Sequence, residues 1–111
     1  MKLLSRIEEM MLLSILKLED NAYGVTIRKM ISEVTGKKWS VGAIYVPLER
    51  LELKGYVESY TGEPTEMRGG RSKRLYKVTR EGYEALEEIK KLNKALWESY
   101  SGLALEKGES K

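Results

Sequence analysis

Cysteine and histidine are both absent from this 111-residue sequence. Without them the chain has no disulfide, no thiolate nucleophile, no imidazole general base and almost none of the usual ligands for transition metals. The side chains that remain for catalysis are the carboxylates, Lys, Tyr, Ser and Thr. None of them belongs to a P-loop or a nucleophile motif. We therefore expect no enzyme activity, no metal and no cofactor.

Long apolar runs are also absent. No run approaches the roughly 20 residues that a transmembrane helix needs. The first residues meet Arg6, Glu8 and Glu9 too early for the hydrophobic region of a signal peptide. We expect one small domain in the cytoplasm, with no membrane partner.

Positive charge is present, but it is unevenly distributed. The net charge is only +3, whereas residues 61–80 alone carry six basic and two acidic side chains. A cationic patch on a nearly neutral body is typical of a nucleic-acid binder. The alternative is a solvated surface hairpin without a ligand. The basic residues of this segment are Arg68, Arg71, Lys73, Arg74, Lys77 and Arg80.

Periodicity predicts a mainly helical α+β fold, a winged helix-turn-helix with a C-terminal dimerisation helix. Helical spacing covers 3–18, 22–35, 40–54 and 80–103, and strand-like alternation covers 56–61 and 75–78. Two helices joined by a short Gly-containing turn, then a hairpin and a helix, have the order of this fold. We expect a DNA-binding domain over 1–79 with its wing over 56–78, a dimerisation helix over 80–104 and a disordered tail over 105–111.

The start of the third expected helix is built from small residues. Ser40 suits the N-cap, and Gly42 and Ala43 would let the helix approach a phosphate or a base edge. Packing against the second helix also favours small residues, so both interpretations stay open. Pro47 removes a backbone hydrogen bond and should bend the helix. Gly55 follows the last turn, where a left-handed residue is expected.

The first and last helices indicate self-association. The first is apolar around most of its circumference, so we expect a second subunit to cover part of it; the alternative is the central core helix of a monomer. The last has a heptad spacing interrupted by one polar residue, Asn93, as in a register-setting seam. The expected dimer contacts are Leu4, Ile7, Met11, Leu86, Ile89, Asn93, Leu96, Trp97 and Tyr100.

Three motifs together resemble the PadR family of transcriptional regulators over about residues 10 to 90. They are Tyr23-Gly24, then Ser40-x-Gly42-x-Ile44-Tyr45-x-x-Leu48-x-Arg50-Leu51-Glu52-x-x-Gly55, then Gly69-Gly70-Arg71-x-Lys73-x-x-Tyr76-x-x-Thr79-x-Glu81-Gly82. The short C-terminal part is similar to the smaller branch of the family. Val41, Ala43 and Pro47 depart from the family pattern, so the operator sequence cannot be carried over.

The resemblance implies a homodimeric transcriptional repressor. It would bind double-stranded DNA at a near-palindromic operator. The third helix would enter the major groove, and the wing would touch the backbone or the minor groove. Some family members release DNA on binding small aromatic ligands, and Trp97 suits such an effector site, although a plain interface residue is the alternative. The residues expected to contact DNA are Tyr23, Lys37, Lys38, Ser40, Val41, Gly42, Tyr45, Val46, Arg68, Arg71, Lys73 and Arg74.

Two other classes of function are alternatives to DNA-binding regulation. A winged helix can serve as a protein-protein interaction module without DNA, but such a module does not need four cations at one hairpin tip. An enzyme could use paired carboxylates, but at helical spacing these are more simply solvated charges. The pairs in question are Glu8-Glu9, Glu49/Glu52 and Glu87-Glu88.

Overall fold

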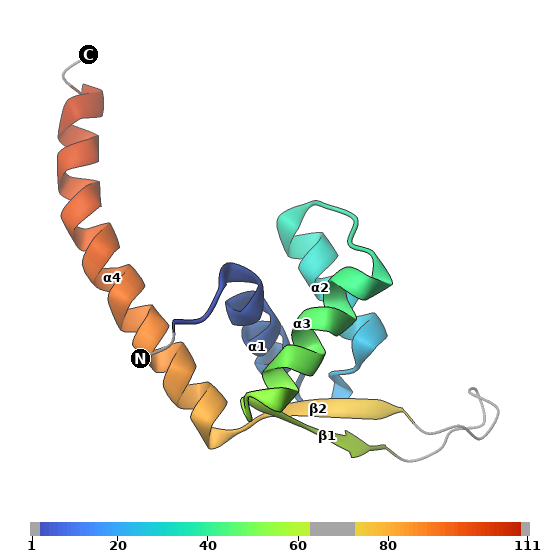
Figure 1. Ribbon diagram of the computed structural model, residues 1–111. Coiled ribbons are helices and arrows are strands. Elements are labelled where there is room, and N and C mark those ends of the chain that lie inside the picture. The colour runs from blue at the N-terminus through green and yellow to red at the C-terminus, as the bar shows by residue number, and fades with distance from the viewer. Residues whose placement is uncertain (1–2, 63–72, 110–111) are drawn as a thin grey trace.

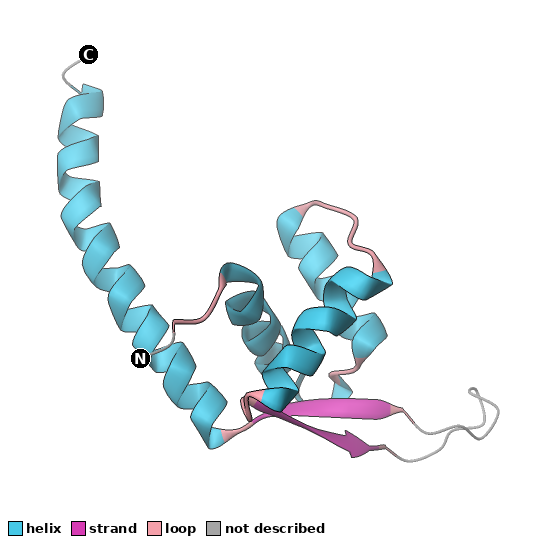
Figure 2. Cartoon of the chain, in the orientation of Figure 1, coloured by secondary structure: helices cyan, strands magenta, loops and turns pink. Residues whose placement is uncertain are grey.

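The computed structural model describes residues 3–62 and 73–109, with side chains over 3–62 and 73–99 (Figures 1 and 2). Helices α1, α2 and α3 gather on one side of a two-stranded sheet, and α4 extends away from them. In chain order the elements are α1 (Arg6–Leu18), a short 3-10 helix (Glu19–Asn21), α2 (Gly24–Thr35), α3 (Val41–Leu53), β1 (Val57–Thr61), β2 (Arg74–Val78) and α4 (Arg80–Glu109).

Hydroxyl side chains begin α1, α3 and α4. Ser40 Oγ accepts a hydrogen bond from the Ala43 backbone N–H at 3.1 Å, and Thr79 Oγ1 accepts one from Gly82 at 3.1 Å. The Ser40 cap was expected from the sequence and is confirmed. The cap of α1 is Ser5, which forms a capping box with Glu8 and which the sequence analysis missed.

Glycine in the left-handed conformation terminates the helices of the helix-turn-helix. Gly36 follows α2 with φ of 69°, and Gly55 lies after α3 with φ of 80°. A side chain at either position would be strained, because L-residues rarely adopt this conformation. The expected left-handed residue at Gly55 is confirmed. Helix α3 runs through Pro47 as one continuous element.

The two strands form an antiparallel ladder in which Val57 lies opposite Val78. The second strand also reaches the start of α2, because Tyr23 forms a β-bridge with Leu75. In addition, the Tyr76 backbone N–H donates to the Ala22 carbonyl at 2.9 Å. These bonds fix the base of the wing to the first turn of the helix-turn-helix. The connection between the strands, 63–72, lies outside the described residues.

Helix α1 runs through the centre of the core and contacts α2, α3, α4 and β2. Its own chain therefore covers most of its apolar surface, which favours the core-helix interpretation for this part of the helix. Apolar burial of this kind is the main stabilising contribution to a small domain. The side chains buried to the greatest extent are Met11, Leu12, Ile15, Ile27, Ile31, Ile44, Leu48, Leu51 and Val57.

Helix α4 has a buried start and an exposed continuation. Leu86 and Ile89 are 7% and 8% exposed, whereas Leu96 and Trp97 are 59% and 64% exposed. The heptad positions of α4 therefore do not form one continuous dimer seam. The first of them are buried in the chain's own core, and the later position Leu96 is exposed on its surface. The helix also continues to Glu109 instead of ending near Leu103, and 110–111 lie outside the described residues.

The observed architecture confirms the expected fold class, a mainly helical winged helix-turn-helix with a C-terminal helix. Over the described ranges 3–62 and 73–109, no helix combines the length and the apolarity needed to cross a membrane. The division into a unit over 1–79 and a dimerisation helix stays a prediction, as does the disordered tail.

Candidate nucleic-acid interface

The turn between α2 and α3 is held by two side chains. Arg28 Nε donates to the Trp39 carbonyl at 2.6 Å, and Trp39 Nε1 donates to Thr35 Oγ1 at 2.8 Å. These bonds tie the turn back onto α2 and fix the angle at which α3 leaves it. Lys37 and Lys38 are exposed on this turn, and Trp39 and Ser40 separate them from the first residue of α3.

The first turns of α3 present an exposed apolar face. Val41 is 54% exposed, Tyr45 39% and Val46 56%, and Gly42 is exposed beside them. The opposite face, with Ile44, is buried in the core. The Ser40 hydroxyl accepts the capping bond from Ala43, so it orients the helix start. The helix therefore shows solvent a narrow face that a DNA groove can admit.

A hollow of about 430 Å³ lies between α2 and α3, and we call it the α2–α3 hollow. Its cationic members are Arg28, Lys29 and Lys38, and the described residues that line it include no carboxylate. The full lining is Gly24, Val25, Arg28, Lys29, Ser32, Lys38, Val41 and Tyr45. Cations without a balancing acid create a positive potential that suits a phosphate chain.

Gly24 determines where Tyr45 lies in this hollow. Gly24 is buried at the start of α2, and a methyl group in its place would overlap the Tyr45 hydroxyl. The absence of a side chain at Gly24 therefore lets the ring lie against the first turn of α2. The two residues belong to separate motifs in the sequence, and the fold brings them together.

The base of the wing is joined to both helices of the interface. Lys73 Nζ lies 4.4 Å from the centre of the Tyr23 ring, a cation–π contact. Arg74 Nη2 contacts Glu52 Oε1 at 3.0 Å, and Ser59 Oγ donates to Glu52 Oε2 at 2.7 Å. Arg74, which was expected to contact a phosphate, is paired here with Glu52 at the end of α3, and its phosphate contact stays a prediction. Arg68 and Arg71 lie outside the described residues.

Glu8 is not the solvated charge that the sequence analysis expected. Its side chain is 3% exposed, and Lys54 Nζ donates to its Oε2 at 2.6 Å. Burial by itself raises the pKa of Glu8, but the bonds from Lys54 and Ser5 outweigh it, so the pKa lies below the ordinary 4.5. This ion pair clamps α1 to the end of α3. The Ser5-x-x-Glu8 capping signature was the available signal.

The expected dimer contacts separate into two groups. Leu4, Met11, Leu86 and Ile89 are buried in the chain's own core, and Ile7 and Asn93 are half-buried. Leu96 and Trp97 are exposed on α4, while the side chain of Tyr100 lies outside the described residues. Among the described side chains of this set, Leu96 and Trp97 are therefore the most exposed to a partner subunit.

A second hollow, about 390 Å³, lies between α1 and α4, and we call it the α1–α4 hollow. It contains the carboxylates of Glu9 and Glu87 and the ammonium of Lys90. The other lining residues are Leu13, Leu16, Tyr83, Leu86 and Asn93. Its charges of both signs contrast with those of the α2–α3 hollow.

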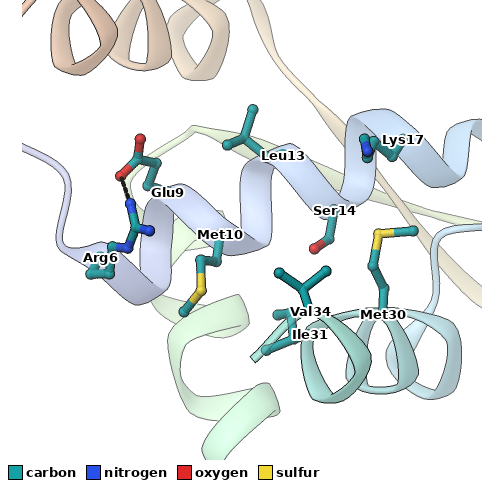
Figure 3. A pocket seen from close by; sticks show the side chains of 9 residues that line it. All are labelled: Arg6, Glu9, Met10, Leu13, Ser14, Lys17, Met30, Ile31 and Val34. Atoms are coloured by element: carbon teal, nitrogen blue, oxygen red, sulfur yellow. Dashed lines mark hydrogen bonds and ion pairs between the residues drawn. The ribbon is translucent and has the colours of Figure 1, made fainter. Parts of the chain in front are cut away.

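Figure 3 shows a third hollow, about 250 Å³, between α1 and α2. Met10 and Ser14 of α1 point toward Ile31 and Val34 of α2, and the Arg6–Glu9 ion pair lies at one end. The apolar stripe of the first helix was noted in the sequence, but not this groove. Among the described residues, no group of acidic side chains is arranged to hold a metal ion.

Two functional candidates were missed by sequence reasoning. Val25 and Lys29 lie one turn apart on α2 and both line the α2–α3 hollow. Their spacing of four residues, directly after Tyr23-Gly24, was a usable signal.

Comparison with known proteins agrees with this geometry. The family model of the transcriptional regulator PadR-like family matches residues 12–88. A comparison with curated protein sequences found no significant match.

Among solved structures, a PadR family transcription regulator from hypervirulent Clostridium difficile R20291 is 25% identical with a TM-score of 0.65, covering 92% of this chain and 97% of that one. A PadR-like transcription factor from Bacteroides fragilis is also 25% identical, with a TM-score of 0.69 over 87% of this chain and 88% of that one.

A transcriptional regulator from Clostridium thermocellum is 24% identical, with a TM-score of 0.67, and covers 86% of this chain and 89% of its own; this likeness bears on the fold alone. The family match spans the helix-turn-helix, the wing and the start of α4. The chain therefore belongs to the transcriptional regulator PadR-like family, and it is a transcription regulator and not an enzyme.

Proposed function

We propose that this protein is a sequence-specific DNA-binding repressor that acts in the cytoplasm as a homodimer on a near-palindromic operator. Helix α3 enters the major groove with Val41, Gly42, Tyr45 and Val46 toward the bases. The cations around it neutralise phosphates. Two copies related by a twofold axis read half-sites about one helical turn, roughly 34–36 Å, apart.

The observation that carries this proposal is the composition of the α2–α3 hollow. Arg28, Lys29 and Lys38 line it without a carboxylate, directly beside the exposed start of α3. Arg28 is bonded to the Trp39 carbonyl, so it also fixes the turn. Lys29 and Lys38 are exposed, and we assign phosphate contacts to them. Such contacts supply most of the affinity of non-specific DNA binding.

The dimer is proposed from the exposed continuation of α4. Leu92, Leu96 and Trp97 are 37%, 59% and 64% exposed on a helix that extends away from the core (Figure 1). A second copy would cover these side chains. Trp97 would then border a space between the copies, where a small aromatic effector could bind and release DNA.

The test of DNA binding begins with selection of bound duplexes from a random pool. Affinity for a selected duplex is then measured at several salt concentrations for the wild type and for the double variant Lys29→Ala, Lys38→Ala. We expect the variant's salt slope to fall by about two units in magnitude. Lys90→Ala, in the α1–α4 hollow, is the matched control and should bind like the wild type. Selection that enriches no duplex in dilute buffer contradicts the proposal.

The second candidate is a protein-protein interaction module without DNA. The apolar groove between α1 and α2 in Figure 3, with Val34 77% exposed, favours it. Under this candidate, Val34→Glu abolishes the protein's regulation of transcription in the cell, and the Lys29, Lys38 double variant retains it. Under the main proposal the outcomes are reversed.

The effector is tested by tryptophan fluorescence. Planar aromatic compounds should quench the emission of the wild-type dimer, and the quenching should vanish in Trp97→Leu. The bonds of Trp39 to Thr35 and Arg28 keep it in the turn between α2 and α3, so Trp39→Phe is the matched control. Quenching that persists in Trp97→Leu contradicts an effector site at this residue.

A further inference from the structure

The exposed start of α3 has no side chain suited to bidentate reading of a purine. Between positions 41 and 49, the exposed residues are Val41, Gly42, Tyr45, Val46 and Glu49, whereas the exposed Arg50 belongs to the last turn of α3. Arg or Lys pairs with guanine and Asn or Gln with adenine through two hydrogen bonds, and none of these types occurs in this set. The N-terminal part of a recognition helix is the part that reaches the base edges.

What this surface offers instead is aliphatic. Val41 and Val46 are both more than half exposed in the first half of α3, with Val41 one turn before Tyr45 and Val46 directly after it. Val25 of α2, 64% exposed, lines the α2–α3 hollow together with Val41. Exposed valines on two neighbouring helices, at the site where the phosphate-binding cations gather, have a chemical counterpart in the major groove.

That counterpart is the C5 methyl group of thymine, the one apolar group on the base edges of the major groove. We propose that this protein recognises its operator mainly through thymine methyl groups, which Val41 and Val46 contact, with Val25 at the edge of the contact. This inference rests on the proposed function. It adds the chemistry by which the operator is distinguished from other DNA.

Several polar groups at the site are oriented by the protein itself or suit phosphates, and the valines are the exposed groups that suit a methyl group. The Ser40 hydroxyl accepts from the Ala43 N–H, and the Tyr45 hydroxyl lies against Gly24. Arg28 Nε is bonded to the Trp39 carbonyl. Lys29 and Lys38 are flexible point charges that suit phosphates, which carry no sequence information.

The test replaces thymine by 2′-deoxyuridine, which removes the C5 methyl group and keeps the Watson–Crick edge. The probe is a duplex obtained by selection from a random pool, with each thymine of the half-sites replaced in turn. We expect replacement at a contacted position to weaken wild-type binding roughly fourfold per methyl group, the amount expected for one buried carbon. The same replacements in a non-operator duplex should change nothing.

Valine variants connect the methyl group to its partner. Val41→Ala and Val46→Ala alter exposed positions, so the fold should stay intact. In one of them, or in the double variant, thymine and uracil should bind equally at the contacted position. A wild type that binds thymine and uracil duplexes equally overturns the inference and leaves DNA binding standing. Discrimination that survives the double variant also overturns it, because the methyl group then acts through DNA shape. Failure to bind any duplex overturns the proposed function itself.

Discussion

The α2–α3 hollow and the α1–α4 hollow are similar in size but differ in charge. The first contains Arg28, Lys29 and Lys38 without a carboxylate, whereas the second contains Glu9 and Glu87 beside Lys90. A polyanion is attracted to the first and gains nothing from the second. Charges of both signs suit contact with another protein surface. The comparison teaches that two hollows of similar size on one small chain can favour different kinds of partner through their charge.

The largest expected effect comes from reversing the charge of the α2–α3 hollow. Lys29→Glu with Lys38→Glu removes two phosphate contacts and adds two repulsions, so affinity for duplex DNA should fall on the order of 100-fold at low salt. A gel shift measures it, and sedimentation checks that the oligomeric state is unchanged. Lys90→Glu in the other hollow is the control. Equal losses in both variants would remove the distinction between the hollows.

The next effect concerns stability and lies away from both hollows. Glu8→Gln breaks the ion pair with Lys54, whose side chain is 33% exposed and can regain water. We expect a loss of about 2 kcal/mol in the free energy of unfolding, measured by urea denaturation. Arg6→Gln, which breaks the exposed pair with Glu9, should cost less than about 1 kcal/mol. Equal costs would contradict the clamp between α1 and α3.

The same ion pair predicts a pH dependence. The pKa of Glu8 is lowered in the folded state, so the folded protein binds fewer protons than the unfolded chain in acid. Its stabilising contribution is complete above the ordinary carboxyl value of 4.5 and disappears as the pH falls through the lowered pKa. The denaturation midpoint of Glu8→Gln should therefore fall less steeply with acid than that of the wild type. Parallel curves would contradict this assignment.

A smaller effect tests the proposed dimer contact on α4, which lies outside both hollows. Leu96→Glu with Trp97→Glu places charge on the exposed continuation of α4, so we expect monomers in sedimentation equilibrium. Affinity for a palindromic duplex should fall about tenfold, since the second half-site is no longer bound by a linked subunit. Lys94→Glu, at another exposed position of α4, should remain dimeric. A dimer that persists in the double variant would assign the interface elsewhere.

The smallest effect tests the placement of Tyr45. An alanine at position 24 would overlap the Tyr45 hydroxyl, and because this ring is 39% exposed it can move aside. Helix propensity favours Ala over Gly, so stability should not fall by more than about 1 kcal/mol. Affinity for the selected duplex should drop about threefold, on the scale of one altered contact. Tyr45→Phe in the same assay reports the hydroxyl alone, and unchanged affinity in Gly24→Ala would separate Tyr45 from the interface.

Much of the fold was predictable because it depends on neighbours in sequence. Ser40 and Thr79 cap helices through residues three positions away, and Gly55 ends a helix by its own backbone conformation. The pairing of Glu8 with Lys54 was not predictable in this way, since 46 positions separate them. The ion pair between Glu52 and Arg74 likewise joins residues that are 22 positions apart.

The proposed dimer contacts were the part that periodicity could not assign. The spacing of Leu86, Ile89 and Leu96 identifies an apolar stripe but not the surface that covers it. In the structure the first two are covered by the chain's own core, and the third is exposed. For the candidate site, Val25 and Lys29 were missed because their role depends on the fold bringing α2 beside α3.

Amide chemical shifts of isotope-labelled protein, recorded with and without a selected duplex, test the central claim most directly. The account predicts the largest shift changes at Lys29, Lys38 and Val41, with Leu13 and Lys90 of the other hollow unchanged. Changes confined to α1 and α4, with those three amides unmoved at saturating duplex, would contradict it.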